Sequence, residues 1–124
     1  MSERLIGLVL AAGRGTRFKS ETIKILHPLL GKPMVSWVVS AVAGLNPTKV
    51  FLLVGHQKEI VQEHIRSNII EYVEQKQQLG TAHAVKAAVP RLKEYSGRNI
   101  LIINGDLPLI QSETLQPMLD QHLE

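Results

Sequence analysis

Three short runs of apolar residues mark the chain, at residues 5–10, 50–54 and 100–103, and a glycine-containing loop follows each of them. Near-continuous runs of this kind are typical of strands that are buried on both faces of a parallel sheet. A fourth segment, residues 69–73, alternates only partly between apolar and polar positions and predicts a shorter, half-exposed strand. The pattern therefore predicts four strands.

Between these runs, apolar residues recur at intervals of three and four, which is the spacing of an amphipathic helix. The predicted helices cover residues 34–45, 60–65 and 81–92. In the third of them the apolar residues on one side are Ala82, Val85, Ala88 and Val89. Strands that alternate with helices predict an α/β fold, here a Rossmann-like parallel sheet with flanking helices and right-handed crossovers.

The composition narrows the class of protein. A chain of 124 residues with 44% hydrophobic content is the size of one ordinary domain. It holds no apolar run of about 18 residues, so we expect a soluble, cytoplasmic protein that does not act at a membrane. A last predicted helix, residues 112–124, has no glycine or proline after it as a stop signal, and we therefore expect a truncated chain.

Charge and residue types limit the ligand. The net charge is only +3 and 4% of the residues are aromatic, which argues against a nucleic-acid groove and favours a small anionic ligand. There is no cysteine, so a metal would have to bind carboxylates, histidines or substrate oxygens. In parallel sheets, ligands bind beyond the carboxyl ends of the strands, which directs attention to three loops.

The first loop, residues 13–17 (GRGTR), contains two glycines two residues apart. Their backbone amides can converge on a phosphate, and Arg17 can add a charged contact. Phe18 stands where a dinucleotide fingerprint would have its third glycine, and no Gly-Lys-Ser/Thr closes a P-loop. On the glycine pair alone, a tight strand-to-loop turn is an equally good interpretation.

The other two loops contain polar residues next to a predicted strand or helix. Residues 75–81 lead into the third helix, where Thr81 is a reasonable N-cap and Gly80 leaves room for a ligand, although a capped helix start explains both. Asp106 follows a buried strand, and one carboxylate oxygen is a common magnesium ligand, although a capped turn is the alternative. For His83, on the predicted helix, we expect packing or solvent contact only.

The wider strings carry a resemblance to a known family. Residues 10–17 (LAAGRGTR), 24–28 (KILHP) and 31–34 (GKPM) resemble the signature of the sugar nucleotidyltransferases. The Lys-x-Leu-His spelling is most similar to the N-acetylglucosamine-1-phosphate uridylyltransferases, which are usually fused to an acetyltransferase domain. Residues 75–84 resemble the loop with which that family reads the base, and the three motifs occur in the expected order.

The resemblance implies roles for individual residues. Arg17 and Lys24 would be the catalytic cations that face the phosphates, and Asp106 would hold Mg²⁺. The remaining nucleotide-binding residues that it implies are Leu10, Ala11, Ala12, Gly13, Gly15, Gln75, Gly80, Thr81, Asn104 and Gly105. Gln75 suits uracil because an amide donates and accepts at once. The chain departs from the family at Ile23, where proline is usual before the lysine.

The function implied is uridylyl transfer from UTP to N-acetylglucosamine 1-phosphate, which gives UDP-N-acetylglucosamine and pyrophosphate for cell-wall synthesis. Residues 1–124 would be the nucleotide-binding half of that domain, inactive alone, in a parent that forms homo-oligomers through a missing C-terminal domain. Two alternatives stay open: a nucleotide-binding module that does not catalyse, and a nucleotidyltransferase for another sugar or cofactor phosphate. The string at residues 75–84 argues against the second.

Overall fold

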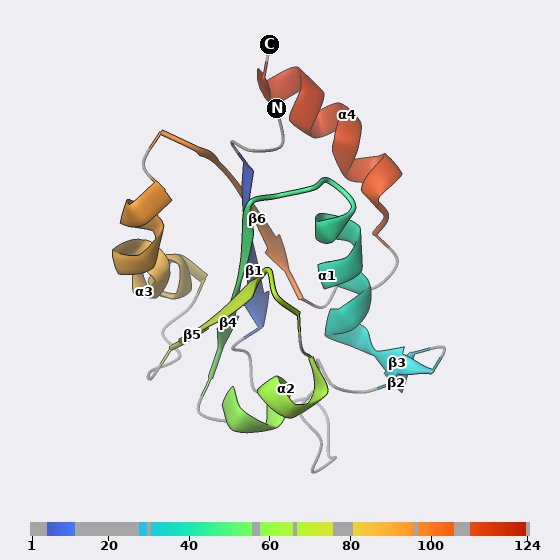
Figure 1. The fold of residues 1–124 in the computed structure, drawn as a ribbon, viewed down its shortest axis with the longest axis vertical. Helices are drawn as coiled ribbons and strands as arrows, with labels where there is room; N and C mark the ends of the chain where they lie inside the picture. Colours follow the sequence, from blue (N-terminus) through green and yellow to red (C-terminus); the bar gives the residue numbers. More distant parts are fainter. Residues whose placement is uncertain are drawn as a thin grey trace.

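The computed structural model describes residues 5–11, 28–29, 31–55, 58–65, 67–75, 81–95, 97–105 and 110–123. Its strands are β1 (Leu5–Ala11), β2 (Pro28–Leu29), β3 (Lys32–Pro33), β4 (Lys49–Val54), β5 (Ile70–Glu74) and β6 (Asn99–Asn104). Its helices are α1 (Met34–Ala43), α2 (Lys58–His64), α3 (Thr81–Leu92), the 3-10 turn η3 (Lys93–Tyr95) and α4 (Ser112–Leu123). The predicted α/β fold is confirmed (Figure 1).

The four longer strands form one parallel sheet in the order β5-β4-β1-β6. β1 lies between two partners, and its Leu8 pairs with Phe51 of β4 on one side and with Ile102 of β6 on the other. All four strands therefore end at the same edge of the sheet. The described part of the chain has no helix long and apolar enough to cross a membrane.

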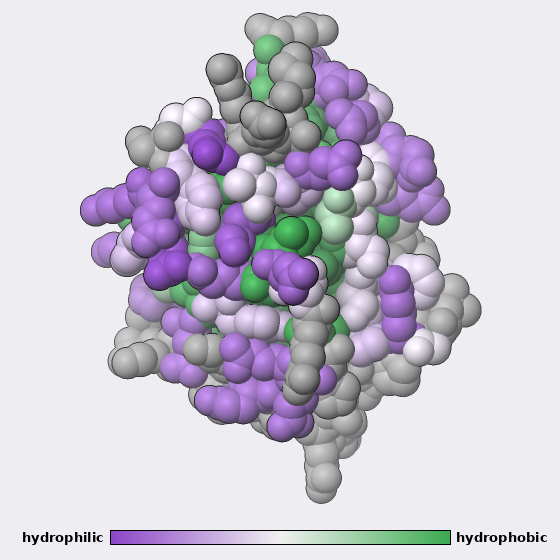
Figure 2. All heavy atoms as spheres, viewed as in Figure 1, coloured by the Kyte–Doolittle hydropathy of each residue, from purple (hydrophilic) through white to green (hydrophobic). Residues whose placement is uncertain are grey.

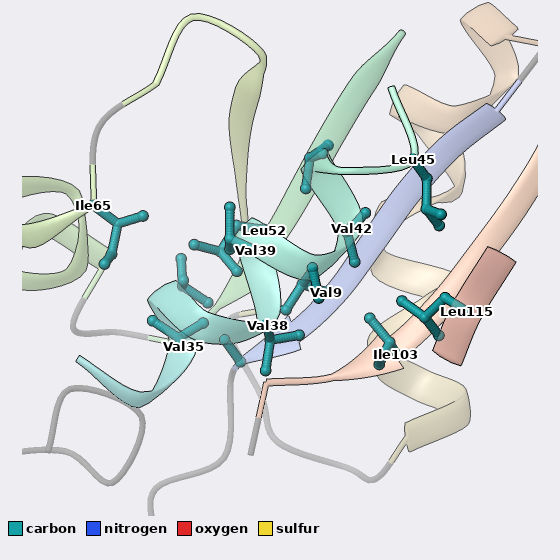
Figure 3. Close-up of a cluster of buried hydrophobic side chains, with 14 of the residues drawn as sticks. Val9, Val35, Val38, Val39, Val42, Leu45, Leu52, Ile65, Ile103 and Leu115 are labelled. Atoms are coloured by element: carbon teal, nitrogen blue, oxygen red, sulfur yellow. The ribbon is translucent and has the colours of Figure 1, made fainter. Parts of the chain in front are cut away.

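One face of the sheet packs against α1, α2 and α4. Figure 1 shows α1 and α4 on the side of the sheet opposite α3. Val9 of β1 is fully buried there beneath four valines of α1, and Ile103 of β6 lies against Leu115 of α4 (Figure 3). Gly7 allows the close contact between β1 and α1, because a Cβ atom at that position would lie 2.7 Å from Cγ1 of Val42. This face holds the larger of the two hydrophobic clusters.

The opposite face is covered by α3 and η3. Its buried cluster joins Ile6, Leu8, Phe51, Leu53 and Val73 of the sheet to Ala84, Ala88 and Leu92 of α3. The ring of Phe51 meets Tyr95 of η3 edge to face, with 5.8 Å between the centroids. Seen from the same direction as Figure 1, hydrophilic residues surround a small hydrophobic area near the middle of the surface (Figure 2).

The burial of two predicted elements differs from expectation. β6 is not buried on both faces: Ile103 is 7% exposed, but Ile100 and Ile102 are 42% and 47% exposed. β6 is an edge strand of the described sheet, and its Ile100 and Ile102 do not belong to the buried cluster beneath α3. In α3, Ala88 is buried as predicted, whereas Ala82 and Val89 are exposed. Alanines on several sides of α3 blur its apolar stripe, which explains the error.

The hairpin of β2 and β3 was not predicted, because strands of two residues are too short to show a period. Gly31 turns the chain between them with φ of +88°, a conformation that side chains disfavour. The hairpin leads directly into α1 at Met34.

Candidate nucleotide-binding site

The carboxyl ends of β1 and β6 lie side by side and are joined through the backbone. Leu10 pairs with Asn104 in the sheet, and beyond that pair the amide of Gly105 donates a hydrogen bond of 2.9 Å to the carbonyl oxygen of Leu10. Ala11 is buried, Leu10 is half-buried and Asn104 is exposed. The structure therefore brings together four of the predicted nucleotide-binding residues: Leu10, Ala11, Asn104 and Gly105.

A side chain at Gly105 would be tightly confined. A Cβ atom there would lie 3.2 Å from the carbonyl oxygen of Leu10, 3.3 Å from Cγ2 of Val35 and 3.5 Å from Cβ of Ala11. The first two distances are tighter than ordinary van der Waals contact, so even alanine would push α1 or β1 aside. The glycine thus lets β1, β6 and α1 converge closely, directly before the predicted metal ligand Asp106 in the sequence.

Gln75 lies at the other side of the same edge, immediately after β5. It is 3% exposed and is the one buried polar or charged residue among those that the structure describes. Its backbone amide donates a hydrogen bond of 2.7 Å to the carbonyl oxygen of Val54, at the end of β4. A buried amide side chain needs partners, because desolvating it without a hydrogen bond is costly.

His83 supplies one of those partners. Its Nδ1 atom lies 2.9 Å from Nε2 of Gln75, and His83 is the third residue of α3. The helix begins at Thr81, as predicted, although the side chain of Thr81 lies outside the described part of the chain. Our prediction for His83 was too narrow. A polar residue in the first turn of a helix, close in sequence to a strand-end glutamine, was the signal that pointed to this contact.

The two sides of the edge are separated by the width of the sheet. Gln75 follows β5 and Gly105 follows β6, which are three strand spacings apart, or roughly 14 Å. One side carries the amide of Gln75, and the other carries the strand end of β6 with the exposed residue Asn104. The arrangement can hold an elongated ligand with a planar polar group at one end.

The basic hairpin residue Lys32 is already engaged. Its Nζ atom lies 4.1 Å from the ring centroid of Trp37 and donates a hydrogen bond of 3.2 Å to Oγ of Ser40. Arg91, whose contacts also belong to the fold, has a pKa raised above the ordinary value of a guanidinium. The hydrogen bond to Glu71 is the main cause of this higher pKa, and it ties α3 to β5.

The remaining predicted residues lie outside the described part of the chain. They are Ala12, Gly13, Gly15, Arg17, Lys24, Gly80 and Asp106. Within the described ranges there is no group of three or more histidine, cysteine, aspartate or glutamate residues that could hold a metal ion. The catalytic cations and the metal ligand therefore stay predictions from the sequence.

Similarity to known proteins agrees with this geometry. The model of the MobA-like NTP transferase domain matches residues 7–124. The chain is 48% identical, over its full length, to the bifunctional protein GlmU of Listeria welshimeri, and 44% identical over 119 residues, 95% of the chain, to that of Geobacter metallireducens. It spans about a quarter of the length of these relatives, 26% and 25% respectively.

Solved structures show the same fold at lower sequence identity. A putative glucose-1-phosphate thymidylyltransferase from Bacillus anthracis superimposes with a TM-score of 0.80 at 21% identity, covering 96% of this chain and 50% of that one. The protein Rv0371C of Mycobacterium tuberculosis, solved in complex with manganese, gives 0.78 at 21%, covering 96% and 59%. The family model extends over nearly the whole chain, and the chain belongs to the MobA-like NTP transferase domain family.

Proposed function

We propose that residues 1–124 are the nucleotide-binding half of a uridylyltransferase domain, which transfers UMP from UTP to N-acetylglucosamine 1-phosphate. The observation that carries the proposal is Gln75, an amide buried and anchored at the carboxyl edge of the sheet. Membership of a nucleotidyltransferase family and the similarity to GlmU proteins support it. The activity of those relatives is proposed for the complete polypeptide that carries this sequence.

In the proposed complex the nucleotide lies across the strand ends. The uracil meets Gln75 and the start of α3, near Gly80 and Thr81, while the backbone of Leu10 and Ala11 packs against the base. The triphosphate extends towards the loop of residues 13–17 and towards Gly105. The roughly 14 Å between Gln75 and Gly105 suits an extended nucleoside triphosphate better than a free sugar phosphate.

The reaction joins two polyanions. An oxygen of the sugar phosphate attacks the α-phosphorus of UTP, the bond to the bridging oxygen breaks, and pyrophosphate leaves with that oxygen. Arg17 and Lys24 reduce the repulsion and stabilise the charge that develops on the leaving group. The attacking phosphate is already ionised at neutral pH, so His27 is not required as a base.

A divalent ion fits this chemistry. Asp106, one residue beyond Gly105, would hold Mg²⁺ through a carboxylate oxygen, with substrate oxygens completing the coordination. When bound, the ion would neutralise phosphate charge and align the reacting groups. The manganese complex of the structurally similar Rv0371C is in keeping with such a requirement.

The test is pyrophosphate release by the complete polypeptide, with UTP or CTP as donor and N-acetylglucosamine 1-phosphate or glucose 1-phosphate as acceptor. We expect turnover with UTP and the N-acetylated sugar, at least tenfold above the other combinations. Lys24→Ala should lower kcat by about a hundredfold, and Asp106→Asn should raise the Mg²⁺ concentration needed for half-maximal rate. Lys86→Ala, an exposed lysine on α3, is the matched control.

Three outcomes would contradict the proposal or one of its residue roles. Turnover with CTP equal to that with UTP would remove the role of Gln75 in base selection. Binding of UTP without turnover by the complete polypeptide would favour the alternative of a nucleotide-binding module. Wild-type kcat in Lys24→Ala would show that this lysine is an ordinary surface residue.

A further inference from the structure

The Gln75–His83 hydrogen bond joins a strand end to a helix start across a loop. Gln75 belongs to the end of β5 and His83 to the first turn of α3, and the link is 2.9 Å long. The backbone of Gln75 is fixed separately by its hydrogen bond to Val54. The side chain is therefore held at both ends, in a site where it is almost entirely removed from water.

An amide that is held in place can still point either way round. Its NH₂ group donates two hydrogen bonds and its oxygen accepts two, and the two ends are nearly equal in shape. Rotation by 180° exchanges a donor for an acceptor at every point that a ligand can reach. What decides between the orientations is the partner at the fixed end.

His83 makes that decision through its tautomer. The arrangement with Gln75 Nε2 facing Nδ1 of the imidazole requires the tautomer in which Nδ1 accepts and the other ring nitrogen carries the proton. Gln75 then retains one N–H donor and its Oε1 acceptor for a ligand. Among the residues that the structure describes, none donates a hydrogen bond to Oε1.

The remaining N–H donor and Oε1 acceptor of Gln75 match uracil better than cytosine. The edge of uracil carries an N–H donor between two carbonyl acceptors, so it pairs with an adjacent acceptor and donor. Cytosine has an acceptor at the ring nitrogen where uracil has a donor, and it pairs with the reversed amide. The orientation of Gln75 thus sets the preference between the two pyrimidines.

We infer that His83 is a positioning residue for base selection: it fixes the orientation of the Gln75 amide and thereby makes the site prefer uracil to cytosine. This inference rests on the proposed function, since it requires a pyrimidine nucleotide at the end of β5. It does not place His83 in contact with substrate. Its effect passes entirely through Gln75.

The test uses the complete polypeptide and measures kcat and KM for UTP, CTP and N-acetylglucosamine 1-phosphate. His83→Phe keeps a ring but removes the nitrogen, and should raise KM for UTP about tenfold while the values for CTP change less than about twofold. KM for the sugar phosphate should not change, because that substrate does not meet Gln75. The same constants are measured for His83→Ala, because the larger ring of phenylalanine could disturb α3.

A conservative variant separates positioning from packing. In His83→Asn the side-chain oxygen lies close to where Nδ1 lay and can accept from Gln75. We expect it to return the UTP-to-CTP ratio of kcat/KM to within about threefold of wild type. Lys86→Ala, exposed on the same helix, should leave the ratio unchanged.

Three results distinguish the possible failures. If the wild type turns over UTP but His83→Phe and His83→Ala keep its UTP-to-CTP ratio, His83 has no part in selection. If both variants weaken UTP, CTP and the sugar phosphate alike and His83→Asn does not recover, His83 is a packing residue. If the wild type itself does not use UTP, the proposed function is at fault.

Discussion

The two faces of the sheet are covered to different extents. On one face, α1, α2 and α4 bury residues from all four strands, including Ile103 of β6. On the other face α3 covers β5, β4 and β1, while Ile100 and Ile102 of β6 stay about half exposed. The same strand therefore has one side packed and one side open, although its sequence is apolar on both.

The difference between the two faces shows that an apolar run in the sequence does not by itself predict burial on both sides of a strand. The run in β6 indicates that both of its sides are suited to burial, but not which part of the protein covers them. The GlmU relatives are about four times as long as this chain, which spans 25% and 26% of their length. The comparison of the two faces can be tested by substitution.

The largest effect should come from Phe51, at the centre of the α3 face. Phe51 is fully buried and its ring contacts Tyr95, so Phe51→Ala removes both burial and an aromatic contact. We expect the free energy of unfolding of the 124-residue chain to fall by about 3–5 kcal/mol in urea denaturation. A loss below about 1 kcal/mol would show that α3 adds little to the sheet.

Ile103 and Ile102 form a matched pair on opposite sides of β6. Ile103→Ala should cost about 2–4 kcal/mol because Ile103 packs against Leu115, whereas Ile102→Ala should cost less than about 1 kcal/mol. Equal losses in urea denaturation would mean that the two sides of β6 are covered alike, and the comparison would fail.

A smaller loss is expected at Gly7, on the α1 face. An added methyl group would lie 2.7 Å from Cγ1 of Val42, so α1 must shift or Val42 must change rotamer in Gly7→Ala. Overpacking of this kind costs about 1–3 kcal/mol. Thermal unfolding of Gly7→Ala with and without Val42→Ala measures it: the second substitution should recover part of the loss.

The smallest effect should come from the ion pair that joins α3 to β5. Arg91 donates to Glu71 at 2.7 Å, but both side chains are well exposed, and exposed pairs of this kind add little stability. We expect Arg91→Ala to leave the thermal midpoint almost unchanged, with no added sensitivity to salt. A clear drop would mean that α3 depends on this contact more than on Ala84, Ala88 and Leu92.

Sequence reasoning identified the main elements because each is long enough to show its period. The ends of β1, β4 and β6 and of α1 to α4 fall within about two residues of the segments predicted. The rule for parallel sheets placed the three loops at one edge of the sheet, whereas the nucleotide-binding roles of Leu10, Gln75 and Gly105 rest on the family resemblance and stay predictions. These successes depend on local pattern and on the rule for connections.

The errors concern contacts between segments. The exposure of Ile102 depends on what lies beside β6, and the partner of His83 depends on the path of the chain between β5 and α3. Neither is encoded in a local period. The buried side of α3 was also misjudged, since Ala84 and Ala88 differ from Ala82 only in which side of the helix packs.

The central place of β1 has a consequence for synthesis on the ribosome. β1 is made first, yet its hydrogen-bonding partners are β4 and β6, and Ile6 pairs with Lys49 and with Ile100. β1 therefore stays unpaired until the chain has grown past residue 54, where β4 ends, and it gains its second partner, β6, only past residue 104. Because closing such long loops is slow, nascent β1 is the segment that a chaperone would shield. Ribosome-bound chains arrested before residue 49 should accordingly remain sensitive to protease in β1, because neither partner strand has yet been made.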